Sequence, residues 1–263
     1  MFNYYIAHIG ITNCIADVRL NDVPLFLGSE RGYQSFSLPL NPCIDHNGKQ
    51  LLTIVMTPPS WQNDNDNNEE SGNESSIWVE VTLFDGKSNT LDRRETVVAS
   101  RLYSENKSFP LSIKHDEKIF QASIDNPVTR WHDCINLNDG RDIQSPVLTY
   151  YNRLLKVFKN KQYDTYNSLI ATREKELVKA LGLDENEIIN RQRMLEDTLS
   201  QGFEAVSMTG EEKIHFFAGG RALSLLTMDN KPALRFFNNQ TGEFLGLDLM
   251  LGIKQGTRQF AII

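Results

Sequence analysis

The sequence predicts two domains, a β-sandwich of the jelly-roll type over residues 1–132 and an α+β domain over residues 145–263. In the second domain, three helices precede an antiparallel curved sheet, and residues 133–145 form a linker rich in Asn, Asp and Gly. Apolar and polar residues alternate along the first half, and three stretches with helical spacing come before a second region of alternation. With 263 residues, 40% of them hydrophobic, the chain can form two cores of ordinary size.

The strands of the first domain follow from short alternating runs separated by turn residues. Phe36, Leu38 and Leu40 alternate with polar neighbours, and an apolar run covers residues 51–56. Asn21-Asp22 has the composition of a tight turn between two strands. Seven or eight short strands at this spacing favour a sandwich.

A polar and acidic insert, residues 60–76, is predicted to be a loop because it has too few apolar residues to contribute to a core. Asp64 and Asp66 are spaced as in a calcium loop, but Glu69 stands where an EF-hand requires glycine and Ser75 where it requires glutamate. No metal site is therefore expected. The candidate binding residues of the insert, exposed and mostly acidic, are Trp61, Asp64, Asp66, Glu69 and Glu70.

Three helices are predicted between the two β-rich regions. Ser145-Pro146 has the composition of a helix start and leads into apolar residues at helical spacing as far as Phe158. The second helix is expected to end at Gly182, and the third to begin at Asp184 and end at Gly202, since glycine is the preferred residue just after a helix.

From residue 203 onward, alternation and turn residues predict four or five antiparallel strands. Three helices followed by a curved sheet loosely resemble the nuclear-transport-factor-like superfamily, and this resemblance implies a cone with a cavity against one sheet face. His215 alternates with the apolar residues of its strand, so it is expected on the opposite face. Together with Arg235 and Asp248, it is the candidate ligand-binding or acid–base residue of such a cavity.

The sequence contains none of the common catalytic motifs, such as G-x-S-x-G, the P-loop, G-x-G-x-x-G or H-E-x-x-H. Residues 131–134 place His132 close to Cys134, but a zinc site needs three or four ligands and no second Cys or His pair occurs. Buried residues at the end of a strand are the simpler interpretation. No cofactor is expected, and a role without catalysis is favoured over an enzyme.

Charge and composition restrict the partners. The net charge is −7, with 34 acidic and 27 basic residues, whereas binding to nucleic acid requires clustered Lys and Arg. No apolar run approaches the ~18–20 residues of a membrane span, and the N-terminal residues lack the pattern of a secretory signal. The three cysteines show no C-x-x-C spacing. A cytoplasmic protein is therefore expected, with no membrane or nucleic-acid partner and an acidic surface suited to a basic protein.

Two segments near the N-terminus carry a family resemblance. Residues 18–22, Val-Arg-Leu-Asn-Asp, are followed by residues 48–54, Gly-Lys-Gln-Leu-Leu-Thr-Ile. These segments resemble the V-x-L-N-G and G-x-N-x-L-x-I patterns of the jelly-roll, sugar-binding-like domains appended to glycoside hydrolases. Asp22 replaces the usual glycine and Gln50 the usual asparagine. The resemblance implies a fold, since this module is often an inert scaffold in such enzymes.

Three functions are open on this basis. The first is a non-enzymatic protein-interaction module, such as a toxin-neutralising immunity protein or an adaptor, which presents an acidic surface. The second is carbohydrate binding, which requires exposed aromatic residues near polar groups; Trp61 is the candidate, because Trp78 and Trp131 are expected in the core. The third is a small-molecule binder or enzyme that uses the cavity of the C-terminal cone.

Overall fold

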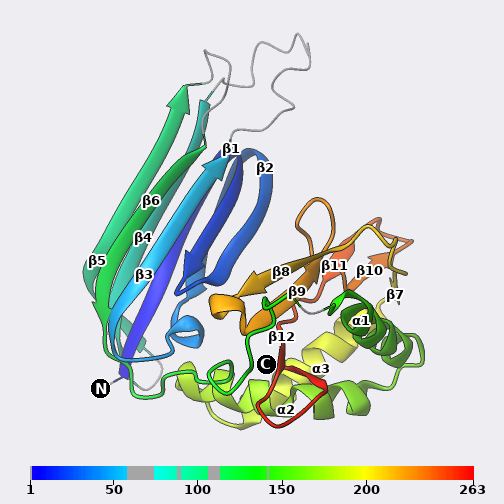
Figure 1. The fold of residues 1–263 in the computed structure, drawn as a ribbon. Coiled ribbons are helices and arrows are strands. Elements are labelled where there is room, and N and C mark those ends of the chain that lie inside the picture. Colours follow the sequence, from blue (N-terminus) through cyan, green and yellow to red (C-terminus); the bar gives the residue numbers. More distant parts are fainter. Residues whose placement is uncertain (1, 58–73, 88–89, 106–112, 141) are drawn as a thin grey trace. The chain divides into compact units, whose positions relative to one another are not determined.

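The computed structural model describes residues 2–57, 74–87, 90–105, 113–140 and 142–263 (Figure 1). Contacts within the chain divide it into two units, Met1–Val128 and Thr129–Ile263. Among the described residues, strands make up the first unit, whereas the second combines three helices with short strands.

The strands of the first unit belong to one antiparallel sheet, which curls on itself in Figure 1. In the described residues the strands are β1 (Phe2–Leu20), β2 (Val23–Pro39), β3 (Gly48–Thr57), β4 (Glu74–Lys87), β5 (Thr90–Glu105) and β6 (Lys114–Ala122). Their order is β5-β4-β1-β3-β6, and β2 pairs with β1. The β-rich first half is confirmed, while its division into the two sheets of a jelly roll stays a prediction.

Strand β1 connects the two arms of this sheet. Its first part, Phe2–Thr12, pairs with β4, and its last part, Ile15–Leu20, pairs with β3. Between them Asn13 adopts a left-handed conformation (φ 43°) in a β-bulge. The inward residues are odd-numbered up to Ile11 and even-numbered from Cys14 onward. The extra residue of the bulge therefore keeps the apolar residues of both parts in one core.

The predicted loop 60–76 is corrected at its end, since residues 74–76 belong to strand β4. Ser75 is fully buried next to the bulge, and its hydroxyl donates a 2.5 Å hydrogen bond to the carbonyl of Asn13. On the other side, the carboxamide oxygen of Asn13 accepts a 2.7 Å hydrogen bond from the backbone N–H of Gly32. Three strands are thus joined at one residue.

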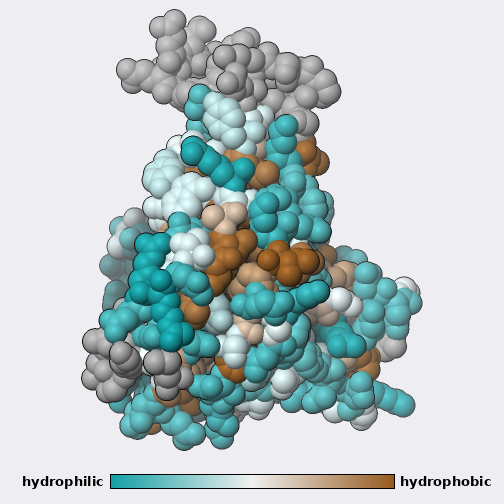
Figure 2. Space-filling view, turned by 90° about the vertical axis from the view of Figure 1, so that its left-hand side faces the viewer, coloured by the Kyte–Doolittle hydropathy of each residue, from teal (hydrophilic) through white to brown (hydrophobic). Residues whose placement is uncertain are grey.

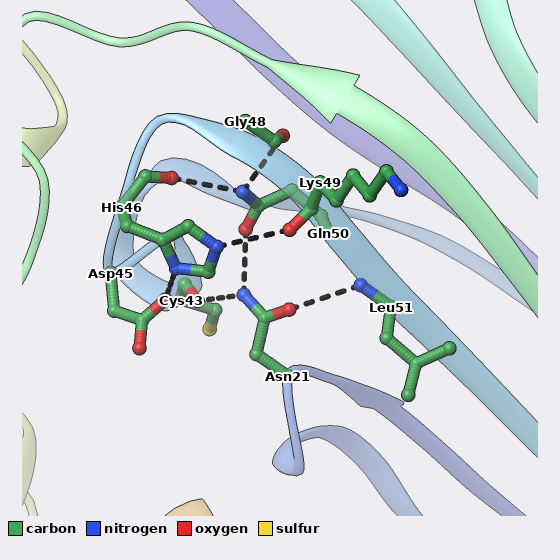
Figure 3. Close-up of polar contacts among 8 residues, drawn as sticks. All are labelled: Asn21, Cys43, Asp45, His46, Gly48, Lys49, Gln50 and Leu51. Atoms are coloured by element: carbon green, nitrogen blue, oxygen red, sulfur yellow. Dashed lines mark hydrogen bonds and ion pairs between the residues drawn. The ribbon is translucent and has the colours of Figure 1, made fainter.

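The predicted turn at Asn21-Asp22 is confirmed, since both residues have positive φ (51° and 63°), as tight hairpin turns require. The side chain of Asn21 donates a 2.6 Å hydrogen bond to Gln50, and its oxygen accepts one of 3.0 Å from the N–H of Leu51 (Figure 3). Gln50, which is fully buried, in turn donates to the carbonyl of His46. The two segments that carry the jelly-roll resemblance therefore contact each other and hold the turn against β3.

The second unit contains the three predicted helices, α1 (Gln144–Lys159), α2 (Tyr163–Ala180) and α3 (Asn186–Ser200). Helix α1 buries a full stripe of apolar residues, including Tyr151 and Leu154. Helix α3 buries little beyond Leu199, and its start is stabilised by the carboxylate of Asp184, which accepts a 2.8 Å hydrogen bond from the N–H of Asn186. None of the described helices is long and apolar enough to cross a membrane.

The strands of the second unit are shorter and more numerous than predicted. The described strands are β7 (Phe203–Ala205), β8 (Lys213–Phe217), β9 (Ala222–Leu226), β10 (Arg235–Asn238), β11 (Phe244–Gly246), β12 (Leu251–Ile253) and β13 (Phe260–Ile262). They form two antiparallel sheets, β11-β10-β7 and β13-β12-β9-β8, instead of one curved sheet. Between them, Leu226 and Pro232 form an isolated bridge, flanked by backbone hydrogen bonds from Ala233 to Leu225 and from Thr227 to Lys231, and β9 and β10 themselves do not pair.

The segment predicted as a linker, residues 133–145, is hydrogen-bonded to the second unit. The N–H of Ile135 donates to the carbonyl of Ile253, and that of Leu137 to Gly220. Residues 130–133 form a turn instead of the expected strand end. Cys134 is buried there, and burial raises the pKa of its thiol.

Candidate functional site

The candidate residues of the polar insert lie outside the described residues. Trp61, Asp64, Asp66, Glu69 and Glu70 belong to the range 58–73, so their arrangement stays a prediction.

The candidate residues of the second unit lie on three separate elements. His215 is in β8, opposite Ser224, and Arg235 is in β10, opposite Gly246 in the other sheet. Asp248 lies between β11 and β12. The residue as a whole is exposed. Its carboxyl group is nevertheless partly desolvated by the surrounding protein, and this raises its pKa. None of the three lines the hollow of about 510 Å³ between the helices and strands β7 and β10 of this unit.

A different group of side chains comes together on the first unit. On the side of the sheet facing away from the core, a hollow of about 390 Å³ is bounded by residues of β1, β2, β4 and β5. Its lining combines one tryptophan with charged and hydroxyl groups, namely His8, Ser35, Phe36, Ser37, Trp78, Glu80 and Arg93.

The strand register brings these residues together from distant parts of the chain. His8 pairs with Ser37 on β2 and with Glu80 on β4. One row further, Gly10 lies between Ser35 and Trp78. Side chains in such cross-strand rows point to the same face, so the rows form a continuous surface.

Trp78 lies flat on the backbone of Gly10. A Cβ atom on Gly10 would be only 2.0 Å from the indole Nε1 and 2.3 Å from Cε2, so no other residue could occupy position 10 without moving the ring. One face of the indole therefore covers the strand, and the opposite face points away from it. Trp78 remains partly exposed.

This position of Trp78 corrects the expectation that it lies in the core. Its neighbours Ile77 and Val79 are buried, with exposed fractions of 0% and 1%, so alternation turns Trp78 outward. The signal was present in the sequence, because Trp78 is out of phase with Ile77, Val79, Val81 and Leu83. Trp131, by contrast, is buried as expected.

The polar groups beside the indole are held in place by hydrogen bonds. Nδ1 of His8 lies 2.8 Å from the hydroxyl oxygen of Ser37. Oε1 of Glu80 accepts hydrogen bonds from Arg93 (2.7 Å) and Thr96 (2.9 Å). The hydrogen bond from Thr96 is the main cause that lowers the pKa of Glu80, so the carboxylate is ionised at neutral pH.

Two tyrosines extend this surface by one row. Tyr33 on β2 pairs with Thr12, which pairs with Ser76 on β4, which in turn pairs with Tyr103 on β5. The exposed fractions of Tyr33 and Tyr103 are 64% and 42%. Trp78, Tyr33 and Tyr103 thus belong to adjacent rows of one outward face, which is named the aromatic face here.

The view in Figure 2 shows a mostly hydrophilic surface with hydrophobic residues gathered near its middle. Exposed apolar residues of the first unit include Leu51 and Ile119, which are directly opposite each other on β3 and β6. Side chains directly opposite each other on neighbouring strands are close enough to form one apolar patch.

Within the part of the chain that the structure describes, no three His, Cys, Asp or Glu side chains are placed so that they could hold a metal ion. Comparisons of the chain with protein-family models, with curated proteins and with solved structures give no match.

Proposed function

We propose that the first unit is a carbohydrate-binding module that binds its ligand on the aromatic face. The observation that carries this proposal is the indole of Trp78, which lies on Gly10, is partly exposed and lines the hollow beside polar side chains. An aromatic ring in this orientation can stack on the apolar C–H face of a sugar ring, and the hydroxyl groups then reach polar side chains at its edge.

The polar groups of the hollow suit hydroxyl ligands. Glu80 is an ionised acceptor, Arg93 is a donor with 61% of its side chain exposed, and His8 and Ser37 can each donate or accept. A volume of about 390 Å³ lies within the range of small-ligand sites, roughly 300–1,000 Å³. Tyr33 and Tyr103 offer further stacking surfaces for a chain of sugars.

A glycan array probed with the purified chain tests the proposal, and two variants locate the site. Trp78→Ala removes the platform, and we expect a loss of affinity of at least roughly tenfold for the glycans that bind, as for an aromatic residue at the centre of an interface. Gly10→Ala adds only one methyl group, 2.0 Å from Nε1, and forces the indole away from the strand. It should therefore weaken binding without removing any group that touches the ligand.

Ile119→Ala is the matched control, since Ile119 is 64% exposed on β6 and does not line the hollow. Circular dichroism establishes that each variant is folded. Unchanged glycan binding by Trp78→Ala, or an array with no bound glycan for the folded wild-type chain, would contradict the proposal.

A second candidate function is the protein-interaction module of the immunity or adaptor type. It is supported by the outward face of β3 and β6, where the exposed pair Leu51 and Ile119 lies beside Glu117. The next rows on either side carry Glu117 and the exposed Lys49, so an apolar centre here has a charged rim, as a protein interface has. Affinity capture at moderate salt, comparing the wild type with Ile119→Lys, tests this function: one stoichiometric partner lost in the variant supports it, and identical capture by both contradicts it.

A further inference from the structure

The second unit contains a hollow of about 510 Å³ where the end of α1, the start of α2, the end of α3 and strands β7 and β10 meet. Four aromatic residues form much of its wall: Phe158, Tyr163, Phe203 and Phe236. Two lysines, Lys159 and Lys161, also line it. This hollow is separate from the aromatic face of the first unit and does not depend on the function proposed for that face.

The aromatic wall is held by its own packing. The ring of Phe158 meets that of Phe236 edge to face, with centroids 5.0 Å apart, and lies 4.7 Å from that of Tyr166. Phe158 and Phe236 are only 5% and 2% exposed. Rings packed in this way change little when a ligand enters, so the hollow is preformed.

Lys161 occupies an unfavourable backbone position. Its φ is 54°, in the left-handed region, and its N–H donates to the carbonyl of Phe158 while that of Gln162 donates to Val157. This pattern ends a helix with one left-handed residue, for which glycine is strongly preferred because it has no Cβ.

The other two helices follow the preference. Gly182 closes α2 with the same pair of hydrogen bonds and a φ of 63°, and Gly202 follows α3 with a φ of 100°. Among the described helices, α1 therefore differs by placing a long cationic side chain at this position, beside a hollow. At this position the lysine is less favourable for the backbone than glycine would be.

The charges of the lining favour an anion. The lining contains two lysines and one glutamate, Glu204, which leaves one net positive charge in a chain of net charge −7. Among the residues that the structure describes, no carboxylate lies within 4.0 Å of the ammonium group of Lys159 or Lys161, and Lys159 donates a 3.1 Å hydrogen bond to the hydroxyl of Ser207.

A smaller hollow next to it, of about 240 Å³, shares Lys161 and Tyr163 but is also lined by Asp164 and Glu196. These acidic groups disfavour an anion on that side. Of the two hollows that Lys161 lines, the larger one, with Lys159, is therefore the more favourable for an anion.

We propose that this hollow binds a small organic anion with an aromatic body, such as an arylalkyl carboxylate. The ring of the ligand packs against Tyr163 and Phe203, which are partly exposed, and its carboxylate pairs with Lys161 and Lys159. The apolar wall supplies affinity, and the lysines supply the preference for a charged ligand over a neutral one of the same shape.

Two probes of equal shape test the preference: hydrocinnamate, a carboxylate, and hydrocinnamamide, its neutral amide. Titration calorimetry, or chemical-shift changes where binding is weak, measures the affinity of both for the full chain. For the wild type we expect the carboxylate to bind at least roughly tenfold more tightly than the amide, and the preference to decrease with added salt.

Lys161→Gly is the decisive variant, because it distinguishes a lysine that binds the ligand from a lysine that only ends the helix. If Lys161 serves the ligand, glycine removes the preference for the carboxylate while the melting temperature stays equal or rises, since glycine suits a φ of 54°. Lys161→Met, which keeps the length of the side chain, should also lose the preference. Lys213→Ala, in β8 and outside the hollow, is the matched control and should keep it.

Three outcomes would overturn the proposal. The wild type binds acid and amide equally, or it binds neither, or Lys161→Gly and Lys161→Met retain the full preference for hydrocinnamate. Variants of Trp78 and Gly10 should leave these affinities unchanged, so a failure here is distinguishable from a failure of the carbohydrate proposal.

Discussion

The two units satisfy their buried polar groups with different chemistry. In the first unit the fully buried polar side chains are amides and hydroxyls: Asn41, Gln50, Ser75 and Thr82. In the second unit the most buried polar side chain that the structure describes is a carboxylate, that of Glu174, which is 1% exposed. Amides do not titrate, whereas a carboxylate does, so the most buried polar groups of the two units should respond differently to acid.

The amides of the first unit bridge backbone groups at strand ends. Asn41 accepts a 2.9 Å hydrogen bond from the N–H of Tyr5 and donates one of 2.9 Å to the carbonyl of Asn3. A further buried group of this unit is the carboxylate of Asp85, paired with Arg94 at 2.6 Å. Asn41 thus satisfies backbone groups near the start of β1, and Asp85 is held by an ion pair near the end of β4.

The carboxylates of the second unit connect helices and loops. Glu174 on α2 is paired with Arg173 (2.6 Å) and with Arg191 of α3 (2.8 Å). Burial opposes ionisation of Glu174, but the hydrogen bonds from Arg191 and Arg173 outweigh it and lower the pKa. The pKa of Glu212 is also lowered, because the N–H groups of Thr209 and Gly210 donate to it and outweigh the effect of burial.

The largest expected effect is that of Glu174→Ala. It leaves Arg173 and Arg191 without their shared partner and should destabilise the second unit by about 3 kcal/mol, the typical cost of breaking a buried ion pair. Urea unfolding followed by the fluorescence of Trp131, with Trp61 and Trp78 changed to Phe, reports on this unit. A free-energy change below about 1 kcal/mol, the range of surface pairs, would show that the pair is not buried in solution.

A second variant at the same position, Glu174→Gln, tests the pH dependence of stability. Because the pKa of Glu174 is lowered from 4.5, the ion pair contributes fully above pH 4.5, and its contribution is lost as the pH falls through the lowered value. Glu174→Gln should therefore flatten the acid-induced loss of stability of the second unit. An identical acid profile for the wild type and the variant would contradict this assignment.

A smaller effect is expected for Asn41→Ala in the first unit. The change leaves the buried N–H of Tyr5 and the carbonyl of Asn3 without their side-chain partners and should cost about 2 kcal/mol. The fluorescence of Trp78, as the only remaining tryptophan, reports on this unit. In contrast to Glu174, the cost should be the same at pH 7 and at pH 4, because an amide does not titrate, and a clear pH dependence would argue against the comparison.

The smallest effect concerns the bulge in β1. Asn13→Gly keeps the left-handed backbone but loses the hydrogen bond from Gly32, and it should cost about 1 kcal/mol. Asn13→Ala loses the bond and also strains the backbone at a φ of 43°, so it should cost more. Thermal unfolding of both variants measures the difference, and equal costs would mean that the left-handed conformation is not retained.

Much of the fold was predictable because it depends on local patterns. The three helices follow from apolar spacing and end signals, and the turn at Asn21-Asp22 follows from residues that tolerate positive φ. The division of the second unit into two sheets was not predicted, because it depends on which strands pair, and the alternation along each strand does not specify its partner.

The candidate site shows the same limit. Alternation along β4 is enough to turn Trp78 outward, but it does not reveal that Gly10 lies under the indole, since the pairing of Gly10 with Trp78 spans 68 residues of sequence (78 − 10). Similarly, the sequence shows a lysine after α1, but not that Lys161 has a left-handed backbone beside an aromatic hollow.

The sequence by itself determined where the chain alternates, where it is helical, and that its overall charge is acidic, because these properties depend on neighbouring residues and composition. Only the tertiary structure decided which strands pair, which rings lie on which backbone, and which charges line a hollow. Those features arise from contacts between residues far apart in the chain, whose register is set by packing of the whole unit.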